Sequence, residues 1–82
     1  MIRYALTTFA GTVEVLLDID DPEGYGVLAF EGPEAALPHV RRDVTSSFGN
    51  RGRTLEGPVC AADLRVAMAG PSLRPYAPKL LD

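Results

Sequence analysis

The feature that most constrains the fold is a stretch of helical periodicity in residues 32–50. Four apolar residues recur at intervals of three and four, and therefore share one stripe of a helix: Leu37, Val40, Val44 and Phe48. Pro33 or Pro38 can begin this helix because the first-turn amide needs no partner, and Gly49 can end it in the left-handed conformation. We therefore predict a long helix over residues 33–49.

Pro38 leaves the start of this helix open between two alternatives. A helix that began at Pro33 would lose an interior hydrogen bond at Pro38, at a cost of about 3 kcal/mol. We therefore expect either a true start near Leu37 or a loose first turn that is followed by a kink.

The residues before this helix alternate with a period of two, which is typical of strands. Three segments fit this reading: residues 2–9, 12–19 and 26–31. The Ala10-Gly11 pair predicts a tight hairpin turn, and residues 20–25 predict a longer one. We predict a three-stranded antiparallel meander over residues 1–31, with the long helix over one face. Its third strand is nearly all apolar, which is typical of the centre of a sheet or of a strand that is covered on both faces.

The residues after the long helix predict a second helix and a proline-rich tail. The helix spans residues 58–70, begins at Pro58 and ends at Gly70. A short fourth strand over residues 53–56 is an option. Residues 71–82 form the tail, which we expect to be extended or turned because each proline fixes φ.

These elements together predict an α+β fold in the order β-β-β-α-(β)-α, in one domain over residues 1–82. An apolar content of 46% is ordinary for a globular domain. No apolar run approaches the roughly 18–20 residues that span a bilayer, so we expect no membrane contact. The first residues lack the continuous apolar segment of a signal peptide, and we expect a cytoplasmic protein.

The second helix carries two apolar stripes on roughly opposite sides. One stripe is predicted to cover the sheet or the first helix: Cys60, Leu64, Ala67 and Met68. The other is a candidate interface: Val59, Ala62, Val66 and Ala69. Either a second copy in a homodimer or the tail could cover the candidate interface. The tail would use its four large apolar residues: Leu73, Tyr76, Leu80 and Leu81.

An acidic turn is the first candidate site, because hard cations bind several oxygens. Its members are Asp18, Asp20, Asp21 and Glu23. The spacing of a calcium-binding EF-hand loop fails, since Glu23 stands where glycine is required and Ala29 where an acidic residue is required. We predict a solvated turn, and no cofactor or metal.

His39 and Cys60 are the only histidine and the only cysteine. The helical period places His39 on the outer face of its helix and Cys60 among core positions, so they do not form a nucleophile and base pair. We assign no catalytic residue and expect a protein that is not an enzyme.

Four arginines are the candidate anion-binding residues: Arg41, Arg42, Arg51 and Arg53. The overall pI of about 5.0 argues against nucleic acid, for which a basic domain is expected. The seven acids of residues 1–40 and the seven bases of residues 41–82 can cancel when the two halves pack together.

The tail contains a minimal PxxP pattern at residues 75–78, which is too short to identify a ligand.

With one histidine, one cysteine and no catalytic motif, the sequence favours binding over chemistry. We predict a small protein-interaction module that acts by binding another protein, such as an accessory or inhibitor protein of a bacterial or phage genome. A nucleic-acid-binding module that uses the four arginines, and a small metal-binding protein or enzyme that uses the acidic turn, remain the alternatives.

Overall fold

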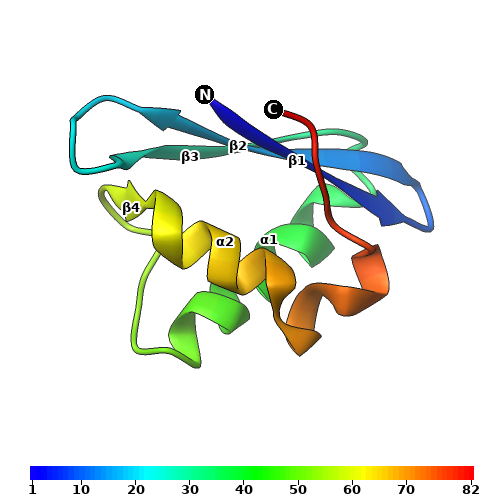
Figure 1. Cartoon of the computed structure of the whole chain (residues 1–82). Helices are drawn as coiled ribbons and strands as arrows, with labels where there is room; N and C mark the ends of the chain where they lie inside the picture. The colour runs from blue at the N-terminus through cyan, green and yellow to red at the C-terminus, as the bar shows by residue number, and fades with distance from the viewer.

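A computed structural model describes residues 1–82 as a five-stranded antiparallel sheet with its helices on one face (Figure 1). The elements in chain order are β1 (Ile2–Thr8), β2 (Gly11–Ile19), β3 (Tyr25–Glu31), α1 (Leu37–Gly49), β4 (Val59–Cys60), α2 (Ala61–Ala69), the 3₁₀ helix η1 (Pro71–Tyr76) and β5 (Lys79–Leu80). The predicted α+β class and the meander of the first three strands are confirmed.

The sheet has the strand order β4-β3-β2-β1-β5, and its inner face forms the core with the helices. Val15 of β2 lies between Tyr4 and Phe30 in the register, and its side chain is fully buried. The opposite face of the sheet has no helix over it (Figure 1). Val27 on that face is 63% exposed, so the apolar third strand is covered on one face only.

Helix α1 begins at Leu37 and not at Pro33, which decides between the two predicted starts. Residues 34–36 form a separate turn, in which the amides of Ala36 and Leu37 both donate to the Pro33 carbonyl. Pro38 then lies in the first turn, where its missing N–H removes no helical bond. The helix ends at Gly49 as predicted, but the positive φ falls later, at Gly52 with 71°.

Helix α2 begins at Ala61, so the predicted span of 58–70 is wrong at its start. Val59 and Cys60 are extended and form β4, which pairs with Tyr25 and Gly26 of β3. The β-branched Val59 is buried there, which favours the strand conformation over a helical first turn. The predicted short strand at residues 53–56 is also wrong, since those residues form a loop.

The proline-rich tail packs on the domain. Leu73 of η1 is fully buried in the core, and the Tyr76 hydroxyl donates a hydrogen bond to the Asp43 carboxylate of α1. Strand β5 then pairs with β1. The prediction of an extended or turned tail missed η1. A proline φ near about −65° also suits a 3₁₀ helix, and Pro75 lies inside this one.

Candidate functional site

The outer strands of the sheet, β4 and β5, have only two residues each, and β4 leaves most of the edge of β3 open. Strand β4 pairs with β3 only at Tyr25 and Gly26. No backbone hydrogen bond outside the regular strand and helix pairs involves Leu28 or Phe30. The second half of β3 therefore has a neighbour on one side only, which is β2.

The direction of the backbone groups on this edge follows from the antiparallel alternation. The amide of Ala61 donates to the carbonyl of Gly24 at 2.8 Å, so Gly24 turns its backbone groups toward the β4 side. Every second residue of an antiparallel strand turns the same way. Leu28 and Phe30 therefore present both of their N–H groups and both of their C=O groups at the open edge.

The edge stays open because the chain turns away from it just before β4. Val59 lies opposite Gly26, so a longer β4 would place Gly57 opposite Leu28. Gly57 instead adopts a φ of 74°, a left-handed conformation that is strained for other residues, and Pro58 has no N–H to donate. These two residues direct the loop away from the sheet.

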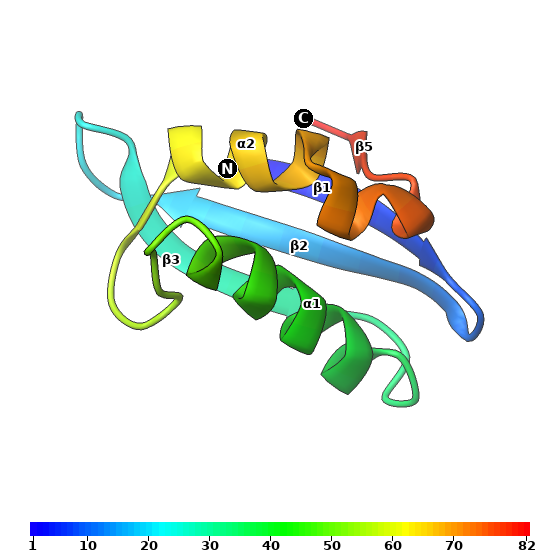
Figure 2. The ribbon, with the colours of Figure 1, turned by 90° about the horizontal axis from the view of Figure 1, so that it is seen from below.

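Arg41 of α1 lies against the inner side of this edge. Its guanidinium carbon is 4.6 Å from the centre of the Phe30 ring, within the range of a cation–π contact. Arg41 is exposed and forms no ion pair with a carboxylate. Figure 2 shows α1 running along the β3 side of the sheet. The edge therefore combines free backbone groups with an unpaired positive charge.

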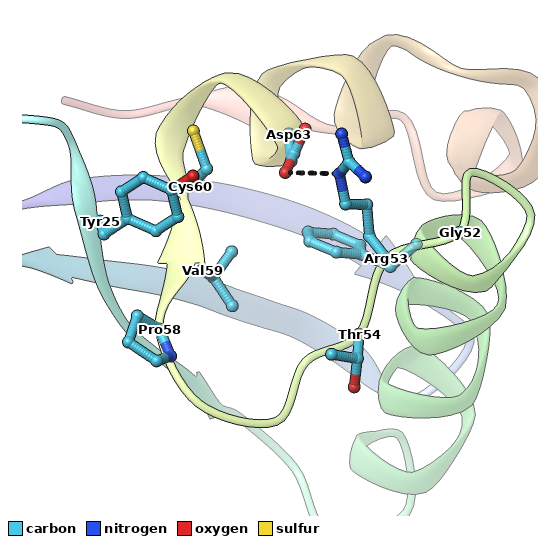
Figure 3. A pocket seen from close by; sticks show the side chains of 9 residues that line it. Tyr25, Gly52, Arg53, Thr54, Pro58, Val59, Cys60 and Asp63 are labelled. Carbon is cyan, nitrogen blue, oxygen red and sulfur yellow. Dashed lines mark ion pairs between the residues drawn. The ribbon is translucent and has the colours of Figure 1, made fainter.

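A cleft of about 530 Å³ lies at the β4 end of the edge (Figure 3). It is lined by Tyr25, Phe48, Gly52, Arg53, Thr54, Pro58, Val59, Cys60 and Asp63. An ion pair of 3.3 Å between Arg53 and Asp63 closes one side of the cleft, and the loop before β4 closes another. The cleft has apolar side chains, such as Phe48 and Val59, beside a comparable share of polar and charged groups, such as Thr54 and the Arg53–Asp63 pair.

The residue pair that would be needed for nucleophilic chemistry is not brought together. His39 packs edge-on against Phe9, with ring centres 5.5 Å apart, whereas Cys60 lies in the cleft wall. The groups beside Cys60 are an ion-paired carboxylate and a tyrosine, and no histidine lines this cleft. His39 and Cys60 therefore lie in separate environments.

The four candidate arginines have different environments. Arg42 pairs with Asp43 at 3.1 Å, and Arg53 pairs with Asp63. Arg51 lines a second, smaller hollow beside Val66 and η1, and not the cleft. Of the four, only Arg41 lies against the open edge of β3.

The acidic turn is held by its own backbone contacts. The Asp21 carboxylate accepts hydrogen bonds from the amides of Glu23 and Tyr25, both at 3.0 Å. Asp18 and Asp20 are exposed, and the structure has no group of three or more potential metal ligands that could hold an ion. The local hydrogen bonds account for Asp21, the one acidic side chain of this turn that accepts them.

The candidate interface is divided between two elements. Val59 lies in β4 and not on α2, and its side chain is buried in the core. Ala62, Val66 and Ala69 lie exposed on α2, with Val66 at 43%. The tail does not cover them, since β5 lies at the β1 edge and Leu80 is itself 57% exposed.

The contact between the tail and α1 shifts the pKa values of both of its residues. The hydrogen bond from Tyr76 is the largest cause that lowers the pKa of Asp43, and Arg42 adds to it. Burial, followed by the same hydrogen bond, raises the pKa of the Tyr76 hydroxyl. Neither residue lines the cleft, and the contact joins η1 to α1.

Comparison of the chain with protein-family models, with curated proteins and with solved structures finds no match. None of the helices has the length and apolar character that crossing a membrane requires.

Sequence reasoning missed the open edge. The apolar run of residues 27–30 predicted a central strand, but what opens the edge is the path of a loop some thirty residues later. The one local signal was the Gly57-Pro58 pair, which is typical of a chain that leaves a sheet.

Proposed function

We propose that this protein is a protein-interaction module that binds an extended segment of another protein as an added strand along β3. The observation that carries the proposal is the open edge, where Leu28 and Phe30 leave four backbone groups without partners. A peptide in the strand conformation would satisfy all four, which is the main source of affinity in this mode of recognition.

The composition of the edge supports this proposal. Proteins commonly protect exposed edges with lysine, proline, a bulge or a very short strand. Residues 27–30 carry neither a charge nor a proline, and their pairing with β2 is regular. The cleft beside β4 would receive a side chain of the bound segment where it reaches the end of the edge.

The experiment uses a displayed library of random decapeptides as the probe. Selected peptides are titrated into the labelled protein, and the exchange of the backbone amides is followed by NMR. We expect the Leu28 and Phe30 amides to exchange quickly in the free protein and to become protected in the complex. Recovery of no binders, or binders that protect other amides only, would contradict the proposal.

Two variants at one position separate the backbone contact from side-chain packing. Leu28→Pro removes the outward N–H, which donates to no residue of this chain, whereas Leu28→Ala shortens the side chain and keeps the N–H. We expect Leu28→Pro to bind the selected peptides about tenfold more weakly than Leu28→Ala, through one lost interfacial hydrogen bond and the proline ring at the edge. Equal binding by the two variants would contradict strand addition.

The other expectations stay predictions. They are a role as an accessory or inhibitor protein of a bacterial or phage genome, cytoplasmic residence, and a homodimer through the exposed face of α2. Nucleic-acid binding by the arginines is less favoured, because Arg42 and Arg53 each already pair with a carboxylate. The acidic turn is also less favoured as a site, since its carboxylates serve the turn or lie apart in solvent.

A further inference from the structure

We infer, on the basis of the proposed function, that the bound segment carries an acidic side chain at the position that faces Phe30. The observation behind this inference is Arg41, an exposed guanidinium 4.6 Å from the Phe30 ring with no carboxylate partner of its own. An occupant of the edge would lie directly beside this charge.

The geometry of an added strand fixes which of its side chains meets Arg41. Neighbouring strands lie about 4.8 Å apart, and side chains of directly opposite residues have Cβ atoms about 5 Å apart on the same face. Phe30 points to the inner face, since it pairs with the buried Val15. The residue opposite Phe30 therefore also points inward, where a glutamate carboxylate reaches the Arg41 guanidinium.

The two faces of the edge differ in charge, so a shift of one residue reverses the preference. Glu31 lies on the outer face of β3 opposite Glu14; Arg3 pairs with Glu14 at 3.2 Å, whereas Glu31, on the strand that an occupant would join, forms no ion pair. Moving the acidic residue of the peptide by one position turns it to this outer face, because side chains alternate along a strand. There it would lie beside the Glu31 carboxylate and away from Arg41.

A second copy of this chain fits the edge less well than an acidic segment. Antiparallel pairing of β3 with the β3 of another copy would match Leu28 and Phe30 with each other, and neither is acidic. It would also bring two unpaired Arg41 side chains to the same side of the joined sheet, where they repel. We therefore assign the edge to an acidic extended segment of a different protein.

The test compares three versions of one selected decapeptide on the full chain: glutamate opposite Phe30, glutamine at that position, and glutamate moved by one residue. We expect the first to bind about fivefold more tightly than the second, as for a surface ion pair worth about 1 kcal/mol, and the third to bind most weakly. The difference should shrink as salt is added.

The matched protein variants are Arg41→Glu and Arg51→Glu. Arg41→Glu is expected to reverse the preference, so that lysine opposite Phe30 binds more tightly than glutamate. Arg51→Glu changes the net charge equally but lies at the other hollow, and should keep the preference for glutamate. Thermal melting of both variants checks that they remain folded.

The outcomes distinguish this inference from the proposed function. If the Leu28 and Phe30 amides become protected but Arg41→Glu binds all three peptides like the wild type, the acidic preference is overturned and strand addition stands. If those amides are never protected, strand addition itself is overturned. If they become protected as the concentration of the protein alone is raised, a second copy occupies the edge and the inference fails.

Discussion

Removal of the Tyr76 hydroxyl tests whether the contact between the tail and α1 stabilises the fold. Tyr76→Phe deletes the hydrogen bond to Asp43 and keeps the packing of the ring. Hydrogen bonds to charged groups contribute about 1.5–3 kcal/mol when buried. Solvent reaches 30% of the Asp43 side chain, so we expect a smaller loss of about 1 kcal/mol in the free energy of unfolding.

The assay is urea denaturation at neutral pH, with wild type and variant measured side by side. A loss of about 1 kcal/mol lowers the midpoint by about 1 M urea for a chain of this size, and lowers Tm by roughly 4–8 °C. Tyr25→Phe is the control, because the Tyr25 hydroxyl takes part in no hydrogen bond and the side chain is exposed. It should stay within about 0.5 kcal/mol of the wild type.

The pH dependence identifies the ionised carboxylate as the partner. The hydrogen bond lowers the pKa of Asp43 in the folded state, so its contribution is present above the unfolded pKa of about 3.9 and is lost as pH falls through the folded value. The pKa of Tyr76 is raised, so its contribution is present below the unfolded value of about 10 and is lost as pH rises through the folded value. The difference between wild type and variant should therefore be constant between these limits.

Two results would refute this reasoning. Equal stability of the wild type and Tyr76→Phe at neutral pH would show that water replaces the hydrogen bond without cost. A difference of the same size at a pH low enough to protonate the Asp43 carboxylate in the folded state would assign the loss to packing of the ring and not to Asp43.

Three further predictions address the core, the exposed face of α2 and the arginines. Val44→Asp places a charge at a fully buried position and should unfold the domain, which circular dichroism would detect; a folded variant with an unchanged Tm would contradict the assigned core face. Sedimentation at high concentration should show a dimer for the wild type and a folded monomer for Val66→Glu, and a monomeric wild type would exclude the α2 interface. Replacement of both Arg51 and Arg53 by Ala should change the free energy of unfolding by about 0.5 kcal/mol or less, and tight DNA binding by the wild type that is lost in this double variant would revive the nucleic-acid alternative.

The parts of the fold that follow a local period could be predicted from the sequence. Val40, Val44 and Phe48 are buried as the 3.6-residue period required, and the alternation of β2 placed Val13 and Val15 in the core. Each of these segments is long enough for the pattern to repeat, and its buried face is set by that pattern.

The parts that depend on two or three residues could not be predicted. The strand β4 has two residues, too few to show a period, and its apolar Val59 is also in phase with the helix that follows. Local spacing therefore assigned Val59 to a helical interface, whereas pairing with Tyr25 and Gly26 makes it a strand. For the same reason the loop at residues 53–56 was an equally acceptable place for a short strand.

The two edges of the sheet are covered differently, and this difference is why we propose strand addition at β3 and not at β1. The chain returns to the β1 edge at its C-terminal end, where β5 pairs with Tyr4 and Ala5 and the Leu81 amide donates to the Arg3 carbonyl. The β3 edge receives only β4, and the loop before it turns away at Gly57. An extended backbone at Gly57 and Pro58 would have carried the pairing with β4 as far as Leu28. Gly57 instead has a positive φ, and the result is a strand edge with free backbone groups, a neighbouring cleft and an unpaired Arg41.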